Sequence, residues 1–370
     1  MPSAIIIGAG PAGASTAITL AKAGWRVDLL EGKSFPRAKV CGEFISPAAT
    51  PIIERLIAPT DLRAAGARQV NELFIDRGDA ERRWPMPRPA WALSRASLDV
   101  MLLDRAAAAG AIVHQPAVVR SASYADDHVA VELIAGGRLS ADILIHADGS
   151  GRHDPAGPTP MRAGVVGLKT HLATSVRGLR MRAAAGTGLA AQAYVGLVAV
   201  EHGLATCALV ASAAMLARFC GHHDALLTHC WPGYDPRTRE RAGDLGNWLA
   251  CGVAGSGYIP PGHPRSFRVG NAAAAVEPVG GEGIGLALWA GSTLSATLTA
   301  APLDLAAVHA AFARDYRRRL RTRRWACRLA AEVMMRPTLA SVAWPALAWP
   351  SLTIRPWYAL TGKPLHASAT

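Results

Sequence analysis

The sequence predicts an α/β fold in which a Rossmann-type nucleotide-binding domain carries an inserted mixed or antiparallel β-sheet domain. Residues 5–23 run from an apolar strand through a glycine-rich turn into an alanine-rich helix. Residues 161–262 instead contain segments that alternate apolar and polar side chains, as antiparallel strands do. A second glycine-rich stretch at 280–285 leads into another apolar helix. Nucleotide-binding elements on both sides of the alternating region predict two interleaved domains.

The first turn has the spacing of a dinucleotide-binding fingerprint. Its first glycine permits a tight turn, its second lets the backbone approach a pyrophosphate, and its third lets helix and strand pack closely. The free N–H groups and the dipole of the next helix then face the phosphates. A second strand at 26–30 precedes an acidic residue, which can accept a hydrogen bond from a ribose hydroxyl. The expected contacts are Gly8, Gly10, Pro11, Ala12, Gly13 and Glu31.

Composition and cysteine usage are typical of a cytoplasmic protein. The 370 residues carry a formal net charge of +12, which attracts a phosphorylated cofactor, a polyanion or an anionic membrane, or simply maintains solubility. The six cysteines form no CxxC pair, so we expect reduced thiols, no disulfide framework and no metal site. The first strand begins almost at Met1, and no apolar run of about 18 residues predicts a spanning helix.

The segment after the second strand predicts a loop, one helix and a hairpin. Pro36 and Gly42 favour a loop over 33–46, whose cations either meet cofactor phosphates or lie in solvent. One helix is expected over 47–66. Strands at 70–76 and 81–85 then pair and reach into the inserted domain.

Three features together resemble the geranylgeranyl-reductase-like branch of the para-hydroxybenzoate hydroxylase superfamily. They are the glycine-rich turn, the acidic residue after the second strand, and the sequence Phe-Pro-Arg-x-Lys-x-Cys-Gly-Glu at 35–43. Proteins of this superfamily are FAD enzymes, and flavin-dependent halogenases and many natural-product monooxygenases stand close to this branch. The resemblance implies FAD in an extended pose, with Gly42, Glu43 and Ile45 on a loop beside it.

Further segments are similar to superfamily motifs in the same order. Residues 95–102 resemble an "R-x-x-x-D-x-x-L" helix start, which implies Arg95 near the FAD; the alternative is a surface arginine. The resemblance places a backbone amide at Val119 against the adenine. It also places Asp148, in the sequence Ala-Asp-Gly-Ser-Gly-Arg at 147–152, near the cofactor phosphates, although the usual Ser-x-x-Arg ending is altered.

Residues 267–285 resemble the superfamily's "GDAA…P…GxG" motif, with Asn271 at the usual aspartate. An asparagine still accepts a hydrogen bond from a ribityl hydroxyl but adds no charge. The resemblance implies that backbone N–H groups near Gly281 and Gly283 face the isoalloxazine ring. Ile284 begins a helix whose positive end would stabilise negative charge on the reduced flavin.

The candidates for proton transfer lie on these cofactor loops. Cys41 is either a reactive thiol or a small buried hydrophobe. Glu43 and Glu282 are either desolvated acid–base groups or carboxylates that brace the loops. His171 and His202 are expected on pocket strands, where a structural role is the alternative.

The resemblance implies a domain division, and the tail departs from it. The expected segments are 1–69, 93–160 and 263–330 for the FAD domain, 70–92 and 161–262 for the substrate domain, and 331–370 for an aromatic-rich cover. The basic run at 314–324 predicts a solvated helix face. The Trp-Pro pairs that follow predict a helical cover over the substrate pocket, and peripheral membrane contact is the alternative.

The leading functional hypothesis is a monooxygenase (hydroxylase) of secondary or lipid metabolism, using O₂ on an aromatic or lipophilic small molecule. NADPH or NADH would react transiently, because a second fingerprint is absent from the sequence. The alternatives are C=C reduction in a prenyl chain and flavin or nucleotide binding without turnover. Residues 194–203 lack both the Tyr-x-Trp-x-Phe-Pro pattern of prenyl reductases and the Trp-x-Trp-x-Ile-Pro pattern of halogenases. No nucleic-acid partner is expected.

Overall fold

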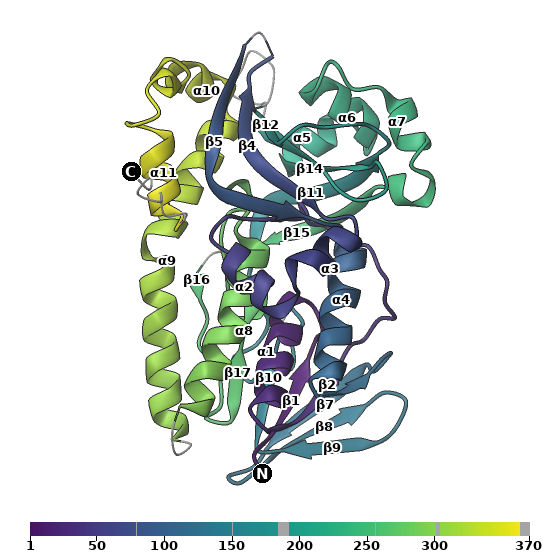
Figure 1. Cartoon of the computed structure of the whole chain (residues 1–370), viewed down its shortest axis with the longest axis vertical. Helices are drawn as coiled ribbons and strands as arrows, with labels where there is room; N and C mark the ends of the chain where they lie inside the picture. Colours follow the sequence, from purple (N-terminus) through teal and green to yellow (C-terminus); the bar gives the residue numbers. More distant parts are fainter. Residues whose placement is uncertain (79, 150, 184–191, 256, 301–303, 363–370) are drawn as a thin grey trace.

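A parallel sheet at one end of the molecule and a larger mixed sheet at the other organise the chain (Figure 1). This arrangement confirms the predicted α/β fold with an inserted sheet. The computed structural model describes residues 1–370 except 79, 150, 184–191, 256, 301–303 and 363–370. One position of the 147–152 motif and the last residues of the expected C-terminal cover therefore lie outside the described residues.

The smaller sheet is parallel throughout and has the order β17-β10-β1-β2-β6. Its strands are β1 (Ser3–Ile7), β2 (Arg26–Leu30), β6 (Ile112–His114), β10 (Ile143–His146) and β17 (Ser266–Arg268). Alternate side chains point to opposite faces: Ile6 and Leu29 pack toward the helices, whereas Ile5 and Leu144 pack toward a small antiparallel sheet. Both faces are thus covered, as a parallel sheet requires.

Helices and a three-stranded sheet form these two covering layers. The helices are α1 (Pro11–Lys22), α4 (Arg95–Ala108) and α8 (Gly283–Thr299), and the strands are β7 (Val119–Tyr124), β8 (Val129–Leu133) and β9 (Arg138–Ala141). A two-stranded pair, β16 (Gly257–Tyr258) with β18 (Ala274–Ala275), lies near α9.

The single helix expected over 47–66 is wrong, because the segment forms two short helices, α2 (Thr50–Leu56) and α3 (Pro59–Ala64). Ile57 is extended, with φ −134° and ψ 123°. Ala58 precedes a proline and has ψ 144°. The ring of a proline disfavours helical geometry in the residue before it, so the first helix ends there.

The larger sheet has the order β15-β11-β14-β13-β12-β4-β5-β3, and among these neighbours only β12 and β4 run parallel. The strands are β3 (Phe44–Ile45), β4 (Arg68–Asp76), β5 (Glu81–Ala92), β11 (Met161–Leu172), β12 (Leu179–Ala183), β13 (Ala193–Ala199), β14 (Ala205–Ser212) and β15 (Leu249–Ala254). One face packs on α5 (Ala213–Arg218) and α6 (His223–Cys230), beside which α7 (Pro236–Glu240) lies. The other face packs on the C-terminal helices.

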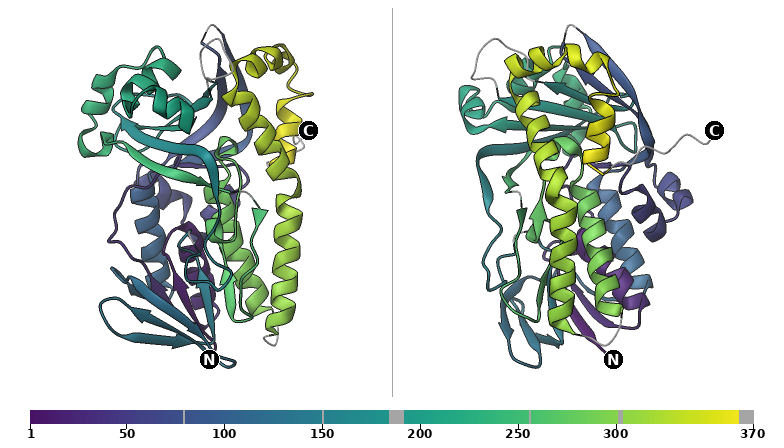
Figure 2. Two further views of the ribbon diagram at one scale, coloured as in Figure 1. Left: turned by 180° about the vertical axis from the view of Figure 1, so that it is seen from behind. Right: turned by 90° about the vertical axis from the view of Figure 1, so that its left-hand side faces the viewer.

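The C-terminal helices are α9 (Leu305–Met335), α10 (Pro337–Ala343) and α11 (Ile354–Leu360). The long α9 runs beside both sheets, and α10 and α11 fold back over the larger one (Figures 1 and 2). The expected domain boundary at residue 330 falls inside α9. Of the basic run, Arg319 and Arg323 are partly buried and the other arginines are exposed. In the part of the chain that the structure describes, no helix is both long and apolar enough to cross a membrane.

The contact between α1 and α8 leaves no room for a side chain at Gly291. A Cβ there would lie 2.2 Å from Ser15 Oγ and 2.6 Å from the carbonyl oxygen of Ala12. We expect Gly291→Ala to lower the free energy of unfolding by about 1–3 kcal/mol, measured by chemical denaturation. Gly233→Ala is the control, because its Cβ would make only ordinary contact with Trp231 at 3.7 Å. Equal stability of the two variants would contradict the close packing of α1 on α8.

Candidate functional site

Crowded backbone surrounds the first glycine-rich turn. Gly8 has a φ of 101°, and a Cβ on it would lie 2.7 Å from the backbone of Ala147. A Cβ on Gly13 would lie 1.8 Å from the carbonyl oxygen of Gly8. Helix α1 begins at Pro11, and neither an acidic residue nor a side-chain cap occupies its described first turn. Its N–H groups therefore suit an anionic group such as a pyrophosphate.

Glu31 lies at the end of β2, beside this turn. The N–H of Ala9 donates to Glu31 Oε2 at 3.0 Å, and the N–H of Lys33 donates to Oε1 at 3.0 Å. The N–H of Ala117 donates to the carbonyl oxygen of Glu31 at 2.7 Å, so Val119 lies close by at the start of β7. This arrangement suits an adenosine whose ribose meets the carboxylate.

Two segments that are distant in the chain lie close to the start of α1. Asp148 Oδ1 accepts a hydrogen bond from the N–H of Gly151 at 2.9 Å. A Cβ on Gly149 would lie 3.9 Å from that of Asn271. A Cβ on Gly270 would lie 2.9 Å from that of Ala12, which is in the first turn of α1. The positions expected at the phosphates and the ribityl chain therefore converge at the N-terminus of α1.

Arg95 is buried beside the turn, which excludes the alternative of a surface arginine. Its side chain is held by Asp99 through two hydrogen bonds of 2.7 Å each. A Cβ on Gly10 would lie 3.4 Å from Arg95 Nη2, so a side chain at position 10 would crowd this guanidinium.

The loop before α8 approaches the loop that carries the Cys-Gly-Glu sequence. Gly281 has a φ of 63°, and a Cβ on it would lie 2.7 Å from the ring of Phe44. A Cβ on Gly280 would lie 2.7 Å from Cys327 Sγ on α9. A Cβ on Gly283, by contrast, would have no described atom within 4 Å apart from its chain neighbours and its own helix, so there is open space beside this residue at the start of α8.

The remaining predicted cofactor positions divide between core and surface. Ile45 and Ile284 are buried in the same apolar cluster. Gly42 is exposed on its loop. If Ile45 and Ile284 contact a flavin, they do so through the backbone, because their side chains already pack in the core.

A buried polar cluster is centred on Glu43. Its carboxylate accepts hydrogen bonds from the N–H of Arg95 at 2.7 Å, from Thr206 Oγ1 at 2.5 Å and from Lys169 Nζ. His171 Nε2 lies 2.8 Å from its Oε2. Glu43 itself is 0% exposed and has a φ of 53°. Four partners from α4, β11 and β14 thus hold one carboxylate.

The partners of Glu43 favour the ionised form of its carboxyl group. Burial would raise the pKa of this carboxyl, but the His171 hydrogen bond and the Lys169 charge outweigh it and lower the pKa to about 2. An ionised carboxylate at neutral pH has no proton to give, which favours the alternative that Glu43 braces its loop.

Cys41 lies two residues before this cluster and among cations. Its Sγ accepts a hydrogen bond from the N–H of Glu43 at 3.3 Å, and it interacts with the guanidinium of Arg95. Lys39 is close to the same group, and burial together with the charges of Arg95 and Arg37 lowers the pKa of Lys39. A thiol role for Cys41 stays a prediction.

Glu282 is buried next to the start of α8 and faces α9. Burial, followed by the charge of Arg323, lowers the pKa of Arg319 to about 10, and the negative charge of Glu282 opposes this shift. These two arginines are partly buried and lie near Glu282, whereas the other arginines of the basic run are exposed. An acid–base role for Glu282 stays a prediction.

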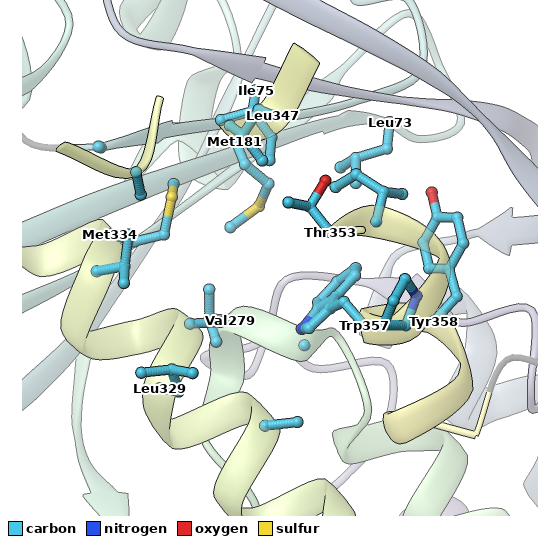
Figure 3. A pocket seen from close by; sticks show the side chains of 18 of the residues that line it. Leu73, Ile75, Met181, Val279, Leu329, Met334, Leu347, Thr353, Trp357 and Tyr358 are labelled. Carbon is cyan, nitrogen blue, oxygen red and sulfur yellow. The ribbon is translucent and has the colours of Figure 1, made fainter. Parts of the chain in front are cut away.

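An apolar cavity of about 380 Å³ lies between the larger sheet and the C-terminal helices (Figure 3). Its walls are apolar side chains from β4, β12 and α9, and Val279 and Gly280 close it on the side of the loop before α8. Phe44 also lines it. Figure 3 shows Met181, Leu347, Val279 and Leu329 around a common space. The cavity thus ends at the two loops beside which a flavin ring is expected.

Tyr358 on α11 lines this cavity and carries a buried hydroxyl group. The side chain is 3% exposed, and its hydroxyl has no hydrogen-bond partner among the described residues. Burial raises the pKa of Tyr358, so the group stays a hydrogen-bond donor. The sequence did not predict this residue, because an isolated tyrosine in a tail gives no signal of where its hydroxyl points.

A second cavity, of about 460 Å³, lies near the start of α4 and is lined by Glu43, Lys169 and His171. His202 also lines it, but from the turn between β13 and β14 with a φ of 58°, not from the expected strand. Lys169 and Thr206 were also not predicted as site residues from the sequence. The polar run Lys-Thr-His at 169–171 within an otherwise apolar strand was the available signal. Among the described residues, no group of three or more potential ligands could hold a metal ion.

Comparison with known proteins is consistent with these observations. Residues 2–154 match the family model described as "FAD binding domain". The chain is 29% identical over 325 residues to a menaquinone reductase of Mycolicibacterium smegmatis, covering 80% of this chain and 76% of that protein. The match and the glycine cradle around the N-terminus of α1 support FAD as the cofactor.

Two solved structures show the same fold. The flavin-dependent brominase Bmp2 superposes with a TM-score of 0.79 at 18% identity, over 97% of this chain and 93% of that one. HpxO of Klebsiella pneumoniae, complexed with FAD and uric acid, gives a TM-score of 0.76 at 19% identity, over 98% and 96%. Together with the family match, these likenesses support a flavin-dependent oxidoreductase, whereas the branch suggested by the sequence is not resolved.

We expect substitutions at Glu31 to weaken FAD binding in a graded order. Glu31→Gln keeps one acceptor oxygen, whereas Glu31→Ala removes both. A hydrogen bond to a charged group contributes about 1.5–3 kcal/mol, so the FAD Kd of Glu31→Ala should rise about tenfold to hundredfold, with Gln between. Titration of the apoprotein by flavin fluorescence measures this. Glu132→Ala on the surface of β8 should leave the Kd unchanged, and equal effects at both sites would contradict the role of Glu31.

We expect the contribution of Glu43 to stability to depend on acid. Its folded-state pKa of about 2 lies below the ordinary value of about 4.3, so the stabilisation is present above that value and is lost as pH falls toward 2. The unfolding free energy of wild type minus that of Glu43→Gln should therefore shrink by up to about 3 kcal/mol between about pH 5 and about pH 2. A difference that stays constant over this range would contradict the ionised cluster.

Proposed function

We propose that this chain is an FAD-dependent reductase that saturates a C=C bond in the prenyl chain of a lipid. The apolar cavity carries the proposal. Its lining is mainly apolar and includes Phe44, Val279 and Gly280. A C=C bond offers no polar group for recognition, so its site must select it by shape and hydrophobic burial.

Similarity to a menaquinone reductase over most of both chains supports a prenyl quinone or a related lipid as the substrate class. A buried hydroxyl at the wall of a mainly apolar cavity is also consistent with a long apolar molecule that carries an oxygen. The Tyr358 hydroxyl would donate to that oxygen, and the bond would remove the cost of burying an unpartnered hydroxyl.

A bound reduced flavin would supply a hydride equivalent, and NADPH or NADH is the proposed electron donor. The cavity walls would orient the prenyl chain and exclude water. The N-terminus of α8, which begins at Gly283, would favour negative charge near its open end. Cys41 and Glu282 remain candidates for moving a proton.

Monooxygenation of a lipophilic aromatic compound is the second candidate. Thr353 and Tyr358 both line the cavity, and two hydroxyl-bearing side chains could orient a phenol. The two functions differ in their need for O₂, because an oxygen atom must enter the product of a monooxygenase and none enters the product of a reductase.

Turnover without O₂ decides between these functions. The FAD-loaded protein is reduced anaerobically with NADPH or NADH and mixed with menaquinone or with a geranylgeranyl lipid that has no quinone ring. We predict flavin reoxidation and a product whose side chain has gained a pair of hydrogen atoms, with both substrates. Oxygen-dependent incorporation of an oxygen atom would instead establish the monooxygenase. A loaded flavin that no substrate reoxidises would favour binding without turnover.

We expect Tyr358→Phe to separate substrate binding from protein stability. Removing an unpartnered buried hydroxyl should leave the melting temperature unchanged or higher. The loss of one hydrogen bond of about 1 kcal/mol should raise KM for an oxygen-bearing lipid about fivefold. Tyr258→Phe is the control, because Tyr258 lies on β16 and lines neither cavity. An unchanged KM in Tyr358→Phe would contradict the proposed contact.

A further inference from the structure

We propose that the C-terminal helices dock this protein on an anionic membrane surface, at the mouth of the apolar cavity. Among the described residues, twelve large hydrophobic side chains are exposed, and half of them lie between residues 325 and 352. We call these six the C-terminal patch: Trp325, Leu329, Leu339, Val342, Trp349 and Leu352. Val342 is 80% exposed and Leu352 is 75% exposed. A group of exposed apolar side chains of this kind often marks a surface that binds a protein or a membrane.

The patch is continuous with the cavity. Trp325, Leu329 and Leu352 are exposed and also line the cavity, so the cavity opens between them. These residues come from α9 and from the segment before α11, and the three C-terminal helices lie together on one side of the molecule (Figure 2). A lipid that leaves a bilayer at the patch would therefore reach the cavity without crossing water.

The positive charge around the C-terminal patch favours an anionic membrane as the partner. Residues 316–362 contain nine arginines and a single acidic residue, Glu332. That carboxylate is already paired with Arg328 at 3.0 Å and with Arg336 at 2.8 Å. Arg321 and Arg355 are exposed. Apolar side chains among cations are typical of helices that lie in the interface of an anionic membrane.

The same charge argues against a second copy of this chain as the occupant. Pairing two such surfaces would bring two arginine-rich segments together, and like charges repel at short range. Docking would be peripheral. It is independent of which reaction the flavin performs, because binding to vesicles is measured without turnover.

Vesicle sedimentation of the FAD-loaded full-length protein tests this docking. We expect binding to vesicles of phosphatidylcholine mixed with phosphatidylglycerol, weak binding to phosphatidylcholine alone, and weakening by salt. Val342→Ser combined with Trp349→Ser removes two patch side chains that do not line the cavity, and should weaken binding about tenfold or more. Arg321→Ala combined with Arg355→Ala should weaken binding to anionic vesicles only.

The control removes exposed hydrophobics elsewhere. Ile112 is 51% exposed and Ile134 55%, and both lie at the far end of the molecule near β6 and β8. Ile112→Ser combined with Ile134→Ser should sediment like wild type. Equal sedimentation of the patch variant and wild type, each with bound FAD and an unchanged melting temperature, would overturn the proposal. A second result would also overturn the proposal: the wild-type protein does not bind vesicles but forms a dimer in light scattering, and the patch variant does not form this dimer.

Discussion

The rest of the structure depends on the buried carboxylate of Glu43. A charge in a protein interior is costly unless it is paired and fully hydrogen-bonded. Its partners come from the start of α4 and from two strands of the larger sheet, namely Arg95, Lys169, His171 and Thr206. The nucleotide-binding domain and the larger sheet must therefore pack in one relative orientation for the Glu43 carboxylate to keep all its hydrogen bonds. The next residue, Phe44, then lies against the loop before α8 and forms part of the apolar cavity.

This docking places two cavities near the cofactor loops. The lining of one includes Glu43 together with Lys169 and His171. The other is apolar and lies between the larger sheet and α9–α11. The helices that cover the apolar cavity also carry the exposed hydrophobic side chains, so in the function and docking that we propose a lipid would enter, bind and react along one side of the molecule. The basic residues of α9 divide into two groups: Arg319 and Arg323 are partly buried near Glu282, whereas the other arginines of the run at 314–324 are exposed.

Much of the nucleotide-binding domain could be predicted because its constraints are local. Gly8 and Gly13 are required by contacts within one strand–turn–helix unit, and Glu31 lies one strand away. The single helix over 47–66 was wrong because the proline at position 59 overrides the helical pattern around it. The partners of Glu43 could not be predicted, since Lys169 is 126 residues away from it in the chain and Thr206 is 163. Periodicity places such residues on a strand but does not say what faces them.

The sequence by itself determined a dinucleotide-binding fold, because glycine spacing constrains the strand–turn–helix unit through short-range sterics, and it predicted the positions where a phosphorylated cofactor would meet bare backbone. It also determined that the tail is basic and rich in tryptophan. Only the tertiary structure decided that Glu43 is a braced anion, that Tyr358 lines an apolar cavity, and that exposed tail residues lie at its mouth. Burial and pairing are properties of segments brought together from distant parts of the chain, so no local pattern encodes them.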